Sequence, residues 1–254
     1  MSPMPRPWSI AGAVALGALC CSAAWALTST FLSSDFEGAA YTAGALLDGQ
    51  DGWVAVTAPA AITVSGQNAH HGRRCGKFDG ALLEKSLFAS QQVEAVCGRW
   101  LNFDPVQQGT PVVRMRASVR LDGPSTPADK ENDAMSVNFY TANDAGQNLG
   151  AFYVESTGKV WASGGGGPYN AFSRPYTIGT YVDLELVLDF DARTMTFVLD
   201  GQSMGSLPLH ATPLESTELL SVAIEMNCRK QVNQRQREQY TAYFDDVSVT
   251  TETR

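Results

Sequence analysis

Apolar and polar residues alternate with a period of two along most of the chain, which is the pattern of strands with one buried face. The clearest example covers residues 113–120 (VRMRASVR), where the arginines share one face and the apolar residues the other. Clusters of Gly, Asp, Asn and Pro separate such runs and mark turns. The pattern predicts about ten strands, the clearest at residues 61–65, 82–88, 112–121, 134–141, 151–155, 159–162, 181–189, 194–200, 219–226 and 242–250.

The turns between these runs favour antiparallel hairpins. Residues 181–189 lead through a short polar turn into 194–199, and Asp200-Gly201 makes the next turn because glycine adopts a positive φ without steric cost. The run 229–239 is polar throughout and is either a loop or a short exposed helix. Hairpins of this kind predict one all-β domain over residues 27–254, a jelly-roll β-sandwich of two antiparallel sheets.

Residues 1–26 have the features of a secretory signal peptide. Arg6 supplies a positive charge, residues 10–24 are apolar and small, and Ala24-Trp25-Ala26 fits a cleavage site. The alternative is a membrane anchor, but the run is shorter than the roughly 20 apolar residues of a spanning helix. We therefore predict a secreted protein, extracellular or periplasmic, without a membrane span in the mature chain.

The net charge of −8 argues against nucleic acid and anionic membranes as partners. Of the five cysteines, Cys75, Cys97 and Cys228 lie beyond the predicted signal peptide. An odd number in a secreted protein indicates one disulfide with a free thiol, or an intermolecular bond. Cys75 and Cys97 flank a hairpin-like stretch, so we favour a disulfide between them and leave the fate of Cys228 open.

Three short motifs carry a resemblance to a known family. They are Asp35-Phe36-Glu37 followed by residues 49–53 (GQDGW), the hairpin at 184–201, and the closing run 244–249 (FDDVSV). Together they resemble the concanavalin A-like lectin/glucanase superfamily, and within it the laminin-G-like and MAM-like jelly rolls. The resemblance implies the sandwich fold over most of the mature chain and says little about function.

The same resemblance implies a structural calcium ion. MAM-like jelly rolls place such an ion between an opening Asp-x-Glu and a closing Asp-Asp, which implicates Asp35, Glu37 and Asp246, with Asp245 as a further candidate. The first and last strands would have to be neighbours. In an extended strand Asp245 and Asp246 face opposite sides, so only one reaches the ion unless a bulge intervenes. The alternative is that these acids are solvated or cap strand ends.

An aromatic loop is the predicted glycan-binding site, because sugars bind to exposed aromatic rings with a few polar groups beside them. In the alternative, Trp161 and Phe172 belong to the core, as Trp53 and Trp100 are predicted to do. The candidate ligand-binding residues are Trp161, Tyr169, Asn170, Phe172, Arg174 and Tyr176.

No catalytic motif is evident in the sequence. The Glu-x-Asp-x-x-Glu pattern of retaining glucanases does not occur, nor does a lyase-like cluster of Arg, Gln, His and Tyr. His70-His71 would bind a transition metal only if other ligands converged on them, and we expect exposed loop histidines. We therefore predict a non-catalytic module that binds extracellular or cell-surface carbohydrate. The alternatives are an adhesive surface protein that contacts other proteins or its own copies and, ranked third, a divergent polysaccharide hydrolase or lyase.

Overall fold

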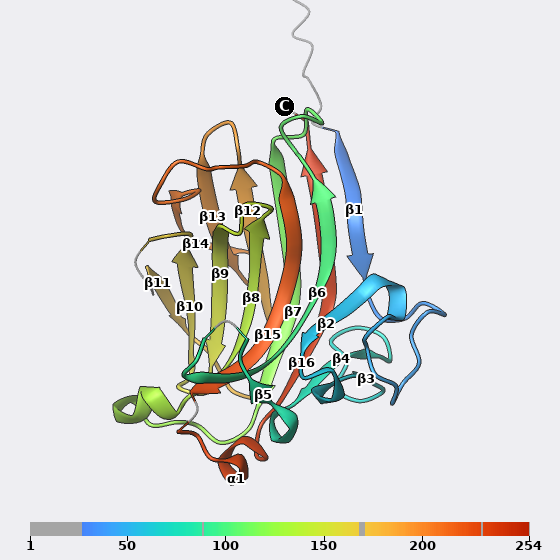
Figure 1. The fold of residues 1–254 in the computed structure, drawn as a ribbon, viewed down its shortest axis with the longest axis vertical. Helices are drawn as coiled ribbons and strands as arrows, with labels where there is room; N and C mark the ends of the chain where they lie inside the picture. Colours follow the sequence, from blue (N-terminus) through green and yellow to red (C-terminus); the bar gives the residue numbers. More distant parts are fainter. Residues whose placement is uncertain (1–26, 88, 168–170, 230, 254) are drawn as a thin grey trace, which may run out of the picture.

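Two antiparallel β-sheets of eight strands each pack face to face in the computed structural model (Figure 1). The structure describes residues 27–87, 89–167, 171–229 and 231–253. The predicted jelly-roll β-sandwich is therefore confirmed. The predicted signal peptide, residues 1–26, lies outside the described residues.

Sheet I contains the last strand of the chain at its centre, and the first strand, β1 (Thr28–Ser34), pairs with the C-terminal half of that last strand, β16. The first and last strands are therefore neighbours, as the calcium prediction required. Apart from β1, the strands of sheet I follow in this spatial order: β14 (Gln202–Pro208), β13 (Thr194–Leu199), β12 (Val182–Asp189), β7 (Val112–Asp122), β16 (Thr241–Glu252), β4 (Cys75–Asp79) and β3 (Ile62–Ser65).

Sheet II is built around two long strands that are distant in sequence, β6 and β15, which pair over ten positions. The short β5 (Glu84–Lys85) pairs with β6 at the edge. Apart from β5, the strands of sheet II follow in this spatial order: β11 (Phe172–Pro175), β10 (Lys159–Gly164), β9 (Asn148–Glu155), β8 (Met135–Asn143), β15 (Leu219–Arg229), β6 (Gln92–Phe103) and β2 (Trp53–Thr57).

In the described residues, helical structure is confined to short segments. The polar run at 229–239, left open by the sequence, contains one turn of α-helix, α1 (Gln234–Arg237), begun by a capping box between Asn233 and Gln236. None of the helices in the described part of the chain is long and apolar enough to cross a membrane. The 3₁₀ helices are Gln50–Gly52, Pro59–Ala61, Gly80–Leu82 and Ala128–Asp133.

The sequence pattern missed six of the strands, of which β6 matters most for the site below. Residues 94–98 of β6 are all buried, on both faces of the sheet, so they lack the alternation that identifies a strand with one wet side. The strand predicted at 82–88 is reduced to β5, because a 3₁₀ helix, Gly80–Leu82, occupies its start. The other strands that the pattern did not predict are β1, β2, β4, β11 and β14.

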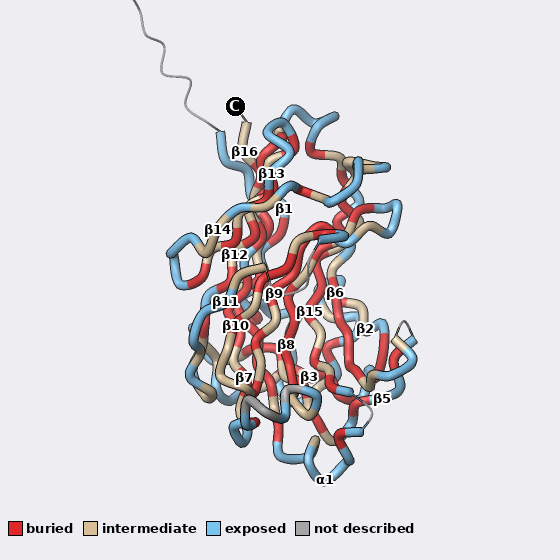
Figure 2. The backbone as a smooth tube through the Cα atoms, turned by 90° about the vertical axis from the view of Figure 1, so that its left-hand side faces the viewer, coloured by how far each residue is buried: buried red, intermediate tan, exposed pale blue. Residues whose placement is uncertain are grey.

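The alternation in β7 produces the burial that it predicts. Val113, Met115 and Val119 are fully buried between the sheets, where Figure 2 shows the buried residues gathered. Arg114 and Arg116 lie on the outer face of sheet I, and each forms a 3.1 Å ion pair with Glu185 of β12. The core is therefore the layer between two inner faces, and both outer faces remain for other tasks.

The predicted disulfide between Cys75 and Cys97 is not formed, and all three described cysteines are free, buried thiols. Cys97 and Cys228 belong to the hydrophobic core between the sheets. Cys75 lies in β4 of the other sheet, with its thiol hydrogen-bonded to the backbone oxygen of Gln67 in the loop that precedes β4. The prediction was wrong because Cys75 and Cys97, which were expected to flank one hairpin, belong to two different sheets.

Candidate functional site

The outer face of sheet II carries side chains in transverse rows, because the register of its strands places outward-facing residues directly opposite one another. The middle row crosses five strands, from β10 to β6. It consists of Trp161, Tyr153, Asn138, Glu225 and Val96. The row on one side consists of Lys159, Glu155, Ser136, Asn227 and Glu94, and the row on the other of Ser163, Ala151, Tyr140, Ala223 and Gly98.

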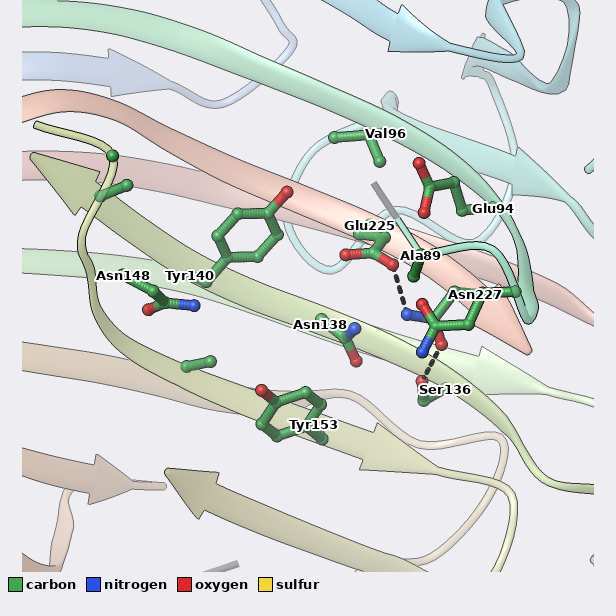
Figure 3. A pocket seen from close by; sticks show the side chains of 14 residues that line it. Ala89, Glu94, Val96, Ser136, Asn138, Tyr140, Asn148, Tyr153, Glu225 and Asn227 are labelled. Carbon is green, nitrogen blue, oxygen red and sulfur yellow. Dashed lines mark hydrogen bonds between the residues drawn. The ribbon is translucent and has the colours of Figure 1, made fainter. Parts of the chain in front are cut away.

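The face is hollowed over the middle row and the row that contains Glu94 and Asn227, with Tyr140 and Ala151 of the third row at the border of the hollow. An open pocket of about 510 Å³ lies here, lined by Tyr140 and Tyr153 and by polar side chains of β6, β8 and β15 (Figure 3). A smaller apolar pocket of about 150 Å³ adjoins it and shares Val96 and Tyr140 with it. Trp100 lines that second pocket and is 51% exposed, so its prediction as a core residue was wrong, whereas Trp53 is fully buried.

Two carboxyl groups lie in the larger pocket, which we call the sheet II pocket. The side-chain amide of Asn227 donates a hydrogen bond to Glu225 and accepts one from Ser136 at 2.7 Å. Burial, opposed by the bond from Asn227 and reinforced by the charge of Glu94, raises the pKa of Glu225 to about 7. Near neutral pH this carboxyl group therefore exists in both its protonated and its ionised form.

The pocket also contains buried acceptors without a partner. Among the described residues, Glu94 Oε1 and Asn138 Oδ1 are buried and accept no hydrogen bond. An unsatisfied buried polar atom costs about 1–3 kcal/mol, so such atoms are uncommon unless a ligand or water bonds to them. These two oxygens are suited to accept hydrogen bonds from the hydroxyl groups of a ligand.

The charge of the pocket is negative or neutral. Of the described residues that line it, none is Lys, Arg or His, while Glu94 and Glu225 supply two carboxyl groups. Lys159 lies beyond its edge, with its ammonium group 4.9 Å from the centre of the Trp161 ring. A polyanionic ligand would meet repulsion here, and a neutral, hydroxyl-rich ligand would not.

The residues of the predicted aromatic loop are dispersed by the fold. Tyr169 and Asn170 lie outside the described residues. Phe172 packs against the core, 6.0 Å from the ring of Phe197, and Tyr176 bonds through its hydroxyl to backbone atoms of Leu121 and Thr180. Arg174 is exposed in the edge strand β11, and of the described members only Trp161 shares the outer face with the sheet II pocket.

Of the acids predicted to bind calcium, Glu37, Asp245 and Asp246 contact the loop 66–74, between β3 and β4. Glu37 Oε1 accepts hydrogen bonds from the backbone nitrogens of Arg73 and Arg74, both at 2.6 Å. Asp35 is exposed and accepts a bond from the nitrogen of Glu37 at 3.0 Å. Glu37 thus contacts the backbone of the loop, Asp35 bonds within its own turn, and calcium binding by this set stays a prediction.

Asp245 and Asp246 both face the same loop because β16 has a β-bulge at this point of its pairing with β7. The register shifts by one residue after Asp245, and Asp246 adopts a positive φ of 51°. Asp245 Oδ2 accepts hydrogen bonds from the backbone nitrogens of His70 and His71, at 3.0 and 3.2 Å. The bulge that the sequence analysis named as a condition is therefore present, and histidines lie opposite these acids.

Sequence reasoning missed the sheet II pocket as a site. The signal was present in part, since Ser136, Asn138 and Tyr140 alternate with core residues in a predicted strand. Glu94 was not identified because its strand was not, and the pairing that brings Glu225 beside Asn138 joins residues far apart in the chain. The sequence of one strand is enough to predict a polar face, whereas predicting this pocket would require the register between four strands.

Comparison with known proteins supports the fold and leaves the function open. No protein-family model and no curated protein matches the sequence. Among solved structures, an endo-β-1,4-glucuronan lyase from the fungus Trichoderma reesei is similar with a TM-score of 0.57 and 8% identity, over 87% of this chain and 95% of that one. A sialidase is similar with a TM-score of 0.50 and 12% identity; 83% of this chain is covered, but only 18% of the sialidase.

A protein of unknown function with a galectin-like fold from Bacillus subtilis has a TM-score of 0.49 and 9% identity, over 89% of this chain and 97% of that one. At such identities the likeness shows the fold alone. The likeness to the glucuronan lyase structure agrees with the predicted jelly roll, and the narrower laminin-G-like or MAM-like resemblance stays a prediction.

Proposed function

We propose that this protein binds a neutral polysaccharide across the outer face of sheet II. The observation that carries the proposal is the combination of two unpaired buried acceptors, Glu94 Oε1 and Asn138 Oδ1, with tyrosine rings in one open pocket. Sugar rings present hydroxyl donors at their edges and apolar C–H groups on their faces, which match these two kinds of group. The predicted signal peptide supports a site of action outside the cytoplasm.

The shape of the face supports a chain rather than a single sugar. The middle row runs from Trp161 on β10 to Val96 on β6, across four strand spacings, or roughly 19 Å. Trp100 extends the surface beyond Tyr140 into the adjoining apolar pocket. Several consecutive sugar units would therefore contact the protein.

The electrostatics favour a neutral glycan over a polyuronate. The glucuronan lyase with a similar fold acts on an acidic polymer, but here two carboxyl groups face the pocket and no described lining residue is basic. Each uronate carboxylate would have to approach Glu94 and Glu225 without a compensating cation.

The Tyr153→Ala and Trp161→Ala variants are expected to bind the preferred neutral polysaccharide at least tenfold more weakly, a loss of about 1.4 kcal/mol. Affinity electrophoresis against β-glucan, xylan, galactan and alginate would measure this. The matched control is Phe31→Ala, which removes a 44% exposed aromatic ring from sheet I. Tighter binding to alginate than to every neutral polymer, or unchanged binding in both variants, would contradict the proposal.

One observation favours a second candidate function, hydrolysis of the bound glycan. Glu225 lies opposite Val96, two residues from Glu94, so the two glutamates are diagonal neighbours on one face of the sheet and both side chains line the same pocket. Glycosidases use two carboxyl groups at about 5–10 Å, one of which donates a proton while the other acts as nucleophile or base. With a pKa of about 7, Glu225 would be the proton donor and Glu94 its partner.

If the chain is a hydrolase, Glu225→Gln and Glu94→Gln are expected to lower the release of reducing ends by about 100-fold or more while binding is retained. Glu215→Gln, which makes the same change at an exposed position, serves as control for the preparation. A wild-type protein that binds the polymer but releases no reducing ends would dismiss the hydrolase and leave the binding proposal intact.

A further inference from the structure

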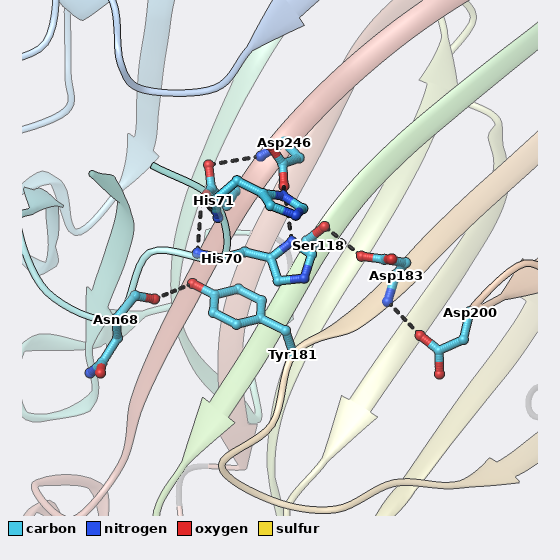
Figure 4. A network of polar contacts seen from close by, with 9 residues as sticks. Asn68, His70, His71, Ser118, Tyr181, Asp183, Asp200 and Asp246 are labelled. Carbon is cyan, nitrogen blue, oxygen red and sulfur yellow. Dashed lines mark hydrogen bonds and ion pairs between the residues drawn. The ribbon is translucent and has the colours of Figure 1, made fainter. Parts of the chain in front are cut away.

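A second group of side chains lies on the opposite outer face of the sandwich, that of sheet I. His70 Nδ1 and His71 Nδ1 lie 2.9 and 2.6 Å from the same oxygen, Asp246 Oδ2 (Figure 4). One ligand atom from each of the three residues lies within 4.8 Å of the other two. Ligands at about 2.0–2.2 Å from a tetrahedral metal are roughly 3.3–3.6 Å apart, so small side-chain rotations would suffice to accommodate an ion.

The histidine backbone is held from two sides by contacts that need no metal. Asp245 accepts hydrogen bonds from both histidine nitrogens, as described above. The ring of Tyr181, which directly precedes β12, lies 4.7 Å from the His70 ring in a tilted arrangement, and its hydroxyl donates a hydrogen bond to the backbone oxygen of Asn68 at 2.6 Å. The loop is thus ordered before a ligand arrives, which lowers the entropic cost of binding.

Asp246 is directed at the histidines by the bulge in β16. Without the additional residue it would face the side of the sheet opposite to Asp245. A positive φ at a non-glycine residue is uncommon and is best tolerated by Asn and Asp. The unusual backbone conformation therefore directs the Asp246 carboxylate to the point where the two imidazoles meet.

The chemistry of the three donors selects a class of ion. Two imidazoles and one carboxylate suit Zn²⁺, Cu²⁺ and Ni²⁺, whereas calcium prefers an all-oxygen set. Three protein ligands leave at least one coordination position, and a cavity of about 490 Å³ adjoins the group. Asp183 lines this cavity and adds negative charge that attracts cations, whereas Glu185, which also lines it, is paired with Arg114 and Arg116.

We propose that His70, His71 and Asp246 form a binding site for a divalent transition metal, with Zn²⁺ as the expected ion. Asp245 is not a ligand in this site; it positions both histidines by accepting hydrogen bonds from their backbone nitrogens. The site lies on sheet I and the sheet II pocket on the other sheet, so the proposal does not depend on glycan binding. Its open position faces the cavity, where water or an external ligand would complete the coordination.

Calorimetric titration of the complete protein with Zn²⁺ tests the proposal. One ion per chain is expected, and His71→Ala and Asp246→Asn are expected to weaken binding at least tenfold. Asn keeps a hydrogen-bond acceptor and tolerates the positive φ, so that variant should remain folded. The matched control is His210→Ala, whose imidazole bonds only within its own turn to Thr212 in the described structure.

Two further measurements separate this site from the alternatives. A hundredfold excess of Ca²⁺ should not displace Zn²⁺, and Co²⁺ substituted for it should give the visible absorption of a site with nitrogen ligands, which His71→Ala removes. Displacement by Ca²⁺, or binding that changes less than threefold in His71→Ala and Asp246→Asn, would overturn the proposal.

Discussion

The Glu225→Gln variant is expected to be more stable than the wild-type protein at pH 8 and equally stable at pH 4. Burial raises the pKa of Glu225 from 4.5 to about 7, so the folded state holds a proton that the unfolded state has released between these values. By linkage, the stability of the wild-type protein falls as pH rises through this window. The full penalty, present above pH 7, is on the order of 2–3 kcal/mol.

Glutamine removes this penalty because it is neutral at every pH and still offers an oxygen to the amide of Asn227. Urea unfolding at several pH values from 4 to 8 would measure the difference. Glu215→Gln is the control, since Glu215 is exposed and the substitution is identical. If the advantage of Glu225→Gln does not grow between pH 4.5 and 7.5, the carboxyl group titrates normally and the electrostatic account of the sheet II pocket is wrong.

A stability gain at Glu225 would also bear on function. Residues selected only for folding are seldom improved by a single isosteric change, whereas binding and catalytic groups often reduce stability. A variant that is more stable at pH 8 but binds or cleaves glycan less well would identify Glu225 as a functional residue under either proposed function.

The Phe244→Ala variant is expected to lose about 3–5 kcal/mol of unfolding free energy. The Phe244 ring is fully buried and lies 5.5 Å from Phe36, 5.6 Å from Trp53 and 5.1 Å from Phe78. These partners come from the opening segment and from both sheets, so the cavity would open where three parts of the fold meet. Since a domain is stabilised by about 5–15 kcal/mol, much of the margin would be removed.

Thermal and chemical unfolding would measure this loss, with Phe31→Ala as the control. Phe31 also contacts another ring, Phe103 at 4.3 Å, but it is 44% exposed, so we expect a loss below about 1.5 kcal/mol. Equal losses in the two variants would show that the aromatic cluster around Phe244 is not a principal part of the core.

This cluster also explains how the two terminal motifs meet. Asp35-Phe36-Glu37 and Phe244-Asp245-Asp246 were expected to be joined by an ion, and their aromatic residues make the direct contact, ring against ring. The acids on either side contact the loop 66–74. That the two terminal motifs lie close together was predictable from a sandwich whose first and last strands are neighbours. That two aromatic rings make the contact depended on side-chain packing.

The sequence by itself determined the antiparallel β class, the hairpin of β12 and β13, and the buried and exposed faces of β7. These depend on the period of neighbouring residues and on turn chemistry, both of which are local. Tertiary structure alone decided that Glu94, Asn138 and Glu225 share a pocket, and that a bulge turns Asp246 toward two histidines. Strand order and register bring together residues more than a hundred positions apart, and burial then sets the pKa of Glu225; no local pattern records either.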